Sequence, residues 1–209
     1  MSVLCTDAGH GGPDSGAVWR GVREKDLNLA FTLLLNRELK QRGHQIYTTR
    51  KSDRHVPPLG IRCRLINAHH QRQAPAFDAI VSIHCNVAVT RDPDTGEYQP
   101  LSSRRGLYVI YSRESALSTQ LAGKIAEQCA SREIALSHRG LLSTLELGRT
   151  LAWIHKTIPT AVLIELGFMT NPDELQLLQS DDYRMQLVAA IADGIDEYLQ
   201  SQDNPEEIS

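Results

Sequence analysis

Short apolar runs alternate with longer segments of helical periodicity along almost the whole chain, and this alternation limits the possible folds more than any other feature. It predicts an α/β domain in which helices cover both faces of a twisted, mostly parallel or mixed sheet of about six strands. Strands are expected at residues 2–6, 44–49, 79–83, 107–111 and 160–164, and helices at residues 24–42, 59–72, about 117–129 and 181–199. The 209 residues suffice for one domain, residues 1–199, followed by a polar tail at 200–209 that we expect to be disordered.

Individual segments show how the pattern separates helix from strand. In residues 24–42, apolar side chains recur every three or four positions and form one stripe, and Gly43 follows where a helix C-cap belongs. Residues 79–83 are apolar almost throughout, which predicts a central strand covered on both faces. Residues 90–105 read as a long polar loop of the kind that is often functional or mobile. Residues 137–157 are ambiguous between a strand and a short helix.

Composition excludes several classes of protein. The formal net charge of −3, from 22 basic and 25 acidic residues, is too small and too mixed for a protein that binds nucleic acid through a basic surface. Aromatic residues make up only 5%, which argues against a stacking platform for single strands. No apolar run approaches the roughly 18 residues of a membrane span. We therefore expect no nucleic-acid partner and no membrane-spanning segment.

The cysteines and the N-terminus bear on the compartment in which the protein is made. The cysteines are scattered, without a C-x-x-C pair, at Cys5, Cys63, Cys85 and Cys129. We expect small buried thiols in a protein made in a reducing compartment. The N-terminus lacks the charged and apolar regions of a secretory signal and reads directly as a strand. Synthesis in the cytoplasm is therefore expected; retention there, export by another route and earlier removal of a leader all stay open.

Residues suited to metal chemistry follow three of the expected strands and open one helix. The first strand runs into a glycine-rich loop that contains His10, the central strand runs into His84, and the last strand is followed by Glu165. Glu24 opens the first long helix, just after the glycine-rich loop. Because ligands bind beyond the carboxyl ends of the strands in such sheets, we expect these four side chains to meet in one crevice.

Two imidazoles and one carboxylate, with one position left open, match a catalytic zinc site, and the second carboxylate would then act as general base for water. Each residue also has an ordinary interpretation. A histidine after a strand is often only a hydrogen-bonded polar residue, Glu24 is a favourable first-turn helix acid, and Glu165 is compatible with a surface loop. The glycine-rich loop matches neither of the common phosphate-binding patterns, G-x-x-x-x-G-K-[ST] and G-x-G-x-x-G.

Several separated motifs occur together in the order of one known family. They are Asp7–Ala17 (DAGHGGPDSGA), Glu24–Ala30 (EKDLNLA), Thr49 and Arg50 with Asp53, Leu59 and Arg62, Ser82–Asn86 (SIHCN), and Ala161–Phe168 (AVLIELGF) with Asn171. From Val3 to about Leu199 the chain resembles the zinc-dependent N-acetylmuramoyl-L-alanine amidases of the amidase-3 type. Residues 90–105 and 137–157 follow the family pattern poorly, which puts substrate specificity, not reaction type, in doubt.

The resemblance implies a Zn²⁺ site formed by His10, Glu24 and His84, with Glu165 as the catalytic general base. The substrate would be peptidoglycan of the bacterial cell wall. The bond cleaved would be the amide between the lactyl group of N-acetylmuramic acid and the L-alanine of the stem peptide. The enzyme would act on the cell wall or periplasmic peptidoglycan after lysis or export.

Two further residues are candidates for hydrogen bonds to the metal-binding imidazoles, which usually donate their other N–H to a carboxylate or carbonyl. These residues are Asp7 and Asn86. Asp7 alternatively caps local backbone N–H groups in a turn, and Asn86 alternatively binds substrate. Arg50 and Arg62 are interpreted as structural. The remaining histidines are expected to bind no metal: His44, His55, His69, His70, His138 and His155.

Two other classes of function stay open. One is a zinc carboxypeptidase or aminopeptidase on the same scaffold, and the other is a non-catalytic wall-binding module, which would need no general base. The biological role is equally open among a phage endolysin, a bacterial autolysin and a sporulation enzyme, and the sequence does not give the oligomeric state. The near-neutral charge offers no strong electrostatic device for wall attachment, so we expect recognition to depend on the crevice itself.

Overall fold

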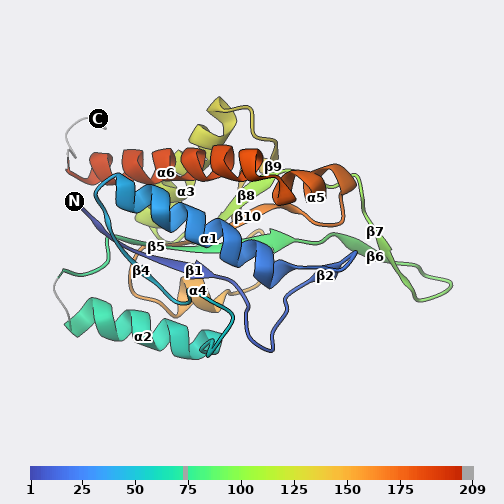
Figure 1. Ribbon diagram of the computed structural model, residues 1–209, viewed down its shortest axis with the longest axis horizontal. Helices are drawn as coiled ribbons and strands as arrows, with labels where there is room; N and C mark the ends of the chain where they lie inside the picture. The colour runs from blue at the N-terminus through green and yellow to red at the C-terminus, as the bar shows by residue number, and fades with distance from the viewer. Residues whose placement is uncertain (73–74, 204–209) are drawn as a thin grey trace.

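Six strands form one mixed sheet in the order β4–β1–β5–β10–β8–β9 (Figure 1). The computed structural model describes residues 1–72 and 75–203. The strands are β1 (Val3–Ala8), β4 (Gln45–Thr48), β5 (Ala79–Asn86), β8 (Leu107–Tyr111), β9 (Leu136–Ser143) and β10 (Ala161–Phe168). Strands β4, β1, β5 and β10 are parallel, whereas β8 is antiparallel to β10 and β9 is parallel to β8. The predicted α/β fold with a mixed sheet is confirmed.

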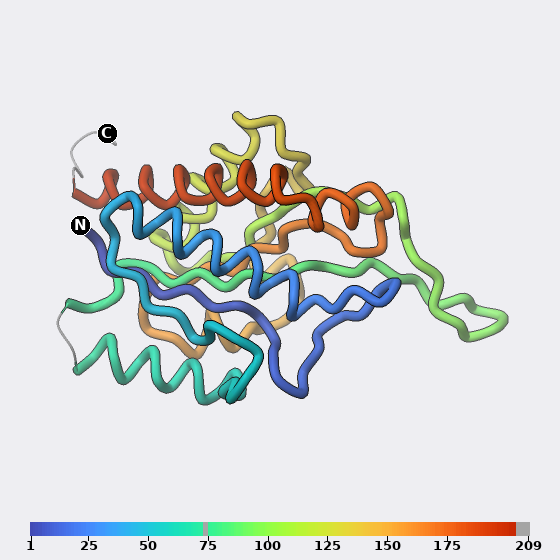
Figure 2. The backbone as a smooth tube through the Cα atoms, viewed as in Figure 1, coloured from blue at the N-terminus to red at the C-terminus, as the bar shows by residue number. Residues whose placement is uncertain are grey.

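Helices cover both faces of this sheet (Figures 1 and 2). One face carries α1 (Glu24–Gln41), α3 (Ala116–Ser131) and α6 (Asp181–Asp203). The opposite face carries α2 (Leu59–Arg72) and the short α4 (Ala152–His155). A further helix, α5 (Pro172–Gln179), follows β10 directly. Asn171 caps α5 by accepting hydrogen bonds from the backbone N–H groups of Asp173 and Glu174, and Pro172 occupies its first turn.

The hydrophobic core has one part on each side of the sheet. On the side of the three long helices, the predicted stripe of α1 buries Phe31 and Leu35 against apolar residues of β5 and α6. On the other side, Ile66 and Trp153 pack with Ile80 and other side chains of the sheet. Because β5 and β10 are central and buried on both faces, they are apolar nearly throughout, as expected for residues 79–83.

The polar segment 90–105 contains a β-hairpin, so the expectation of a loop throughout is wrong. Strands β6 (Val89–Arg91) and β7 (Tyr98–Pro100) pair antiparallel and project from the domain (Figure 2). The turn between them is closed by Asp92, whose Oδ1 atom accepts hydrogen bonds from the backbone N–H groups of Asp94 and Thr95. An aspartate that bonds to its own turn can stabilise a hairpin without any apolar pattern.

The ambiguous segment 137–157 contains both alternatives, because β9 is followed by a loop and then by α4. A second hairpin, β2 (Val18–Trp19) with β3 (Val22–Arg23), was not predicted. Its turn residues, Arg20 and Gly21, both have positive φ, as a two-residue hairpin turn requires.

The last helix, α6, continues to Asp203, so its expected end near residue 199 and the expected start of the disordered tail at 200 are wrong. The rest of that tail, 204–209, lies outside the described residues. All four cysteines are buried and free, as predicted. Within the described part of the chain, no helix is long and apolar enough to cross a membrane.

Candidate active site

A cavity of about 620 Å³ lies on the sheet face that carries α2 and α4. Its floor is a row of cross-strand partners, in which Asp7 pairs with Ser82, Ser82 with Leu163, and Leu163 with Ile110. Two residues further along these strands, His84 pairs with Glu165. Paired residues of neighbouring strands project to the same face of a sheet, so the fold itself brings these side chains to one cavity.

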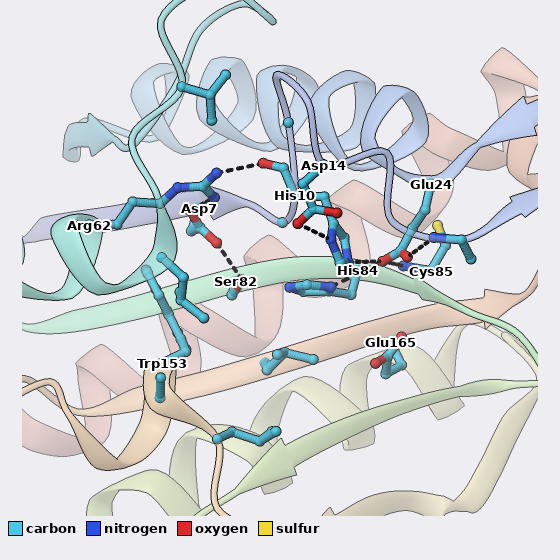
Figure 3. A pocket seen from close by; sticks show the side chains of 18 of the residues that line it. Asp7, His10, Asp14, Glu24, Arg62, Ser82, His84, Cys85, Trp153 and Glu165 are labelled. Atoms are coloured by element: carbon cyan, nitrogen blue, oxygen red, sulfur yellow. Dashed lines mark hydrogen bonds and ion pairs between the residues drawn. The ribbon is translucent and has the colours of Figure 1, made fainter.

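His10, Glu24 and His84 converge at one end of this cavity (Figure 3). The Oε1 atom of Glu24 lies 3.2 Å from Nε2 of His10 and 3.1 Å from Nδ1 of His84. One potential ligand atom from each of the three residues lies within 4.8 Å of the others. This is the meeting of side chains that the strand-end pattern predicted. No other group of three such ligands occurs in residues 1–72 and 75–203.

The glycine-rich loop allows the imidazoles and the carboxylate to approach so closely. A Cβ atom at Gly9 would overlap the His84 ring, and one at Gly16 would lie 2.6 Å from Oε2 of Glu24. His10 itself has a φ of 63°, a conformation that a non-glycine residue adopts only when its surroundings impose it. The loop therefore holds His10 in a fixed orientation towards Glu24.

Glu24 is buried, and backbone and side-chain donors surround it. Its Oε2 atom accepts a hydrogen bond from the backbone N–H of Ala17 at 2.9 Å, and Oε1 accepts from Asn28 Nδ2 at 3.2 Å. Burial opposes ionisation, but hydrogen bonds with His10 and His84 outweigh it and hold the pKa of Glu24 well below its usual range. The same contact with Glu24 raises the pKa of His10 to about 9, against the effect of burial. Glu24 is therefore a carboxylate at neutral pH.

Glu165 lines the same cavity on the strand next to that of His84 (Figure 3). Its Oε2 atom is buried and has no hydrogen-bond partner among the described residues. Burial raises the pKa of Glu165 to about 7, because the loss of water disfavours the charged form and the His84 charge only partly compensates. A carboxyl group that titrates near neutrality and bonds to nothing around it is suited to receive and release a proton.

Asp14 is a site residue that the sequence analysis missed. Its Oδ2 atom lies 2.8 Å from Nδ1 of His10, and its Oδ1 atom accepts a hydrogen bond from the backbone N–H of Gly16 at 3.0 Å. The sequence spacing could have indicated this contact, because Asp14 follows His10 by four residues in a loop that must fold back on itself. Asp14 thus leaves Nε2 of His10 to face Glu24.

Asp7 and Asn86, predicted as the partners of the imidazoles, bond elsewhere. Asp7 accepts hydrogen bonds from Arg62 and Ser82, and the amide of Asn86 contacts the hydroxyl of Tyr108. Both carboxylate oxygens of Asp7 are thus engaged within the sheet, by Arg62 on one oxygen and Ser82 on the other. Both residues still line the cavity.

Arg50 and Arg62 brace the end of β1, in agreement with their structural interpretation. Arg62 pairs with Asp7 at 2.9 Å and donates to the backbone oxygen of His10 at 2.6 Å. Arg50 donates from Nε to the backbone oxygen of Ala8 at 2.9 Å. The buried guanidinium groups thereby donate hydrogen bonds to backbone carbonyls at the point where the chain leaves the sheet and enters the loop.

The donor set fits a divalent transition metal. Two imidazole nitrogens and one ionised carboxylate suit zinc better than they suit magnesium or calcium, which prefer oxygen ligands. Such a site requires a carboxylate close to both imidazoles and a second carboxyl group nearby. Glu24 is buried and faces both imidazoles, and the adjacent Glu165 has a carboxyl oxygen without a partner. His10, Glu24 and His84 are therefore the residues able to hold a metal.

The chain belongs to the Amidase_3 family: the family model, described as N-acetylmuramoyl-L-alanine amidase, matches residues 4–197. The uncharacterized protein YqiI of Bacillus subtilis (strain 168) is 34% identical over 192 residues, which cover 92% of this chain and 82% of YqiI. The germination-specific N-acetylmuramoyl-L-alanine amidase of the same organism is 26% identical over 221 residues, with 98% and 83% covered.

Solved structures agree with this assignment. The catalytic domain of CwlV, an N-acetylmuramoyl-L-alanine amidase from Bacillus (Paenibacillus) polymyxa var. colistinus, superimposes with a TM-score of 0.76 at 30% sequence identity. The superposition covers 96% of this chain and 99% of the CwlV domain. The observed fold is therefore that of the catalytic domain of an amidase.

Proposed function

We propose that the protein is a zinc-dependent peptidoglycan hydrolase. It cleaves the amide between the lactyl group of N-acetylmuramic acid and the L-alanine of the stem peptide. Family membership supports the hydrolysis of a peptidoglycan amide. The observation that carries the mechanism is the Glu165 carboxyl group, which lies beside a cluster of three potential ligands. One of its oxygens is buried without a partner, and burial raises its pKa to about 7.

In this proposal His10, Glu24 and His84 hold the zinc ion. When bound, zinc supplies a Lewis acid that polarises the carbonyl oxygen of the amide. Asp14 fixes the ring of His10 through Nδ1, which keeps Nε2 available on the side of Glu24. The two glycines Gly9 and Gly16 leave the room in which these side chains meet.

Glu165 moves the proton in this mechanism. Its carboxylate takes a proton from the attacking water while the water oxygen forms a bond to the amide carbon. Glu165 then delivers that proton to the nitrogen of L-alanine as the carbon–nitrogen bond breaks. The products are the free lactyl carboxylic acid and a free amino group, so atoms and charge balance. Burial, which raises the pKa of Glu165, suits a group that must both accept and donate a proton.

Product analysis of purified peptidoglycan, with and without a chelator, tests the proposal. The expected products are intact stem peptides with a free L-alanine amino group, identified by mass spectrometry, and chelator should abolish their release. A carboxypeptidase would instead release single residues from the end of the stem peptide. A wall-binding module would release nothing, and either result would overturn the proposal.

A further inference from the structure

A second hollow adjoins the active-site cavity, and Arg149 lines both. This groove has a volume of about 620 Å³ and is formed by the loop after β8, the loop between β9 and α4, and the end of α4. Nothing in the catalytic mechanism uses it. Because the two hollows share a side chain, a molecule that fills the first can extend into the second.

The charges in this groove are mainly positive. Arg113 and Arg149 lie in its wall with exposed side chains, and Glu114 and His155 are the other ionisable residues that line it. The ion pairs formed by arginines in residues 1–72 and 75–203 involve neither Arg113 nor Arg149. Both guanidinium groups are therefore available to an incoming anion.

Arg149 lines the active-site cavity together with Glu165, and it also lines the groove. Arg149 therefore marks the path from the scissile amide into the groove.

We propose that the groove binds the free carboxylates of the stem peptide, with Arg149 and Arg113 as the binding residues, an inference that rests on the proposed function. The two sides of the scissile amide differ in charge. The N-acetylated sugars on one side are neutral, whereas the peptide on the other side retains free carboxyl groups along its length and at its end. A wall that presents two unpaired guanidinium groups is complementary to the peptide and not to the glycan.

Because Arg149 lines both hollows, a peptide that leaves the active-site cavity meets this side chain as it enters the groove. Glu114 in the same wall would repel a carboxylate, which leaves the two arginines to set its position.

Kinetics of three variants test the proposal. R149Q and R113Q remove the charges, and R37Q is the matched control, because Arg37 is an exposed residue of α1 that lines neither hollow. The substrates are an N-acetylmuramoyl peptide with free carboxylates and the same compound with those groups amidated. We expect R149Q and R113Q each to raise KM for the carboxylate substrate about 3- to 10-fold, the range of an exposed charge-assisted contact, with kcat unchanged. The amidated substrate should not distinguish them from R37Q.

A binding measurement separates this inference from the proposed function. Calorimetric titration of the protein as purified with the sugar-free carboxylate peptide should show the same fold-loss of affinity in R149Q and R113Q. Equal affinities in all three variants, or equal losses with the amidated peptide, would overturn the inference even if the wild-type protein cleaves peptidoglycan. Failure of the wild-type protein to release stem peptides would instead overturn the proposed function.

Discussion

Glu165 and His84 are direct cross-strand partners in the parallel pair formed by β10 and β5. Their side chains project to the same face of the sheet, so the general base proposed for the reaction stands beside a proposed metal ligand. The next pair in the register is Phe168 with Asn86, after an irregularity in β10. The regular ladder therefore ends at the two residues to which the mechanism assigns its chemistry.

Replacement of Glu165 should separate metal binding from catalysis. We expect E165Q to retain one zinc ion per chain and to lose activity by about 10²- to 10⁴-fold, the usual contribution of a general acid–base group. Elemental analysis and product release from peptidoglycan measure the two properties. E97Q, an exposed change in the projecting hairpin, is the control and should behave as wild type. Near wild-type activity of E165Q would remove Glu165 from the mechanism.

Removal of the Asp14 carboxylate should weaken metal binding without abolishing it. Asp14 bonds to Nδ1 of His10, and loss of such a partner typically costs about 10- to 100-fold in metal affinity. Competition with a chromophoric chelator would measure the affinity of D14N. D94N, at the exposed tip of the hairpin, provides the matched control. An affinity for D14N equal to that of D94N would show that Asp14 does not support the site.

A methyl group at Gly9 should disrupt the site by displacing His84. A Cβ atom at this position would overlap the imidazole ring, whereas one at Gly60 in α2 meets no atom within 4 Å. We expect G9A to lose zinc and activity, and G60A, a change in the first turn of α2, to keep both without loss of stability. Elemental analysis and thermal unfolding give the two readouts. Zinc retention by G9A would show that His84 is dispensable or free to move.

The stability of the metal-free protein should fall between about pH 6.5 and pH 9. The contact with Glu24 raises the pKa of His10 to about 9, so its stabilisation is complete below the unfolded value of about 6.5 and is lost as pH rises through 9. The lowered pKa of Glu24 acts at the other end, since its stabilisation is present above about pH 4.3 and is lost in acid. The optimum should therefore lie on the acid side of neutrality.

Thermal unfolding in excess chelator across this range measures the effect, and H10Q isolates it. Glu165, with a pKa raised to about 7 by burial, contributes a decline of the same sign that runs from about pH 4.3 to pH 7. The diagnostic interval is therefore between pH 7 and pH 9, where H10Q should show a shallower loss of stability than the wild-type protein. Parallel curves in that interval would contradict the assigned shift of His10.

The hydrophobic periodicity was sufficient to predict the class of fold and to select four candidate site residues, and the family resemblance supplied the roles proposed for them. Strands and helices follow from which positions are apolar, and that information is local. Ligands in an α/β sheet bind at the carboxyl ends of strands, so His10, His84 and Glu165 could be selected because each follows an expected strand. The observed strands β5 and β10 extend beyond the expected ends and include His84 and Glu165. Glu24 could be selected because it opens the helix that leaves the same loop.

The partners of these residues depended on the tertiary structure. Asp7 is close to His10 in sequence, but it lies within β1 and pairs with Arg62, whereas the turn of the loop brings Asp14 to the imidazole. The hairpin at β6 and β7 is closed by side-chain-to-backbone bonds that leave no periodic pattern. The groove lined by Arg113 and Arg149 lies between the loop after β8 and the loop after β9, and these loops are neighbours because β9 pairs with β8. Sequence patterns thus selected the candidate site residues, and long-range packing decided which side chains meet, because contacts between distant segments have no local signal.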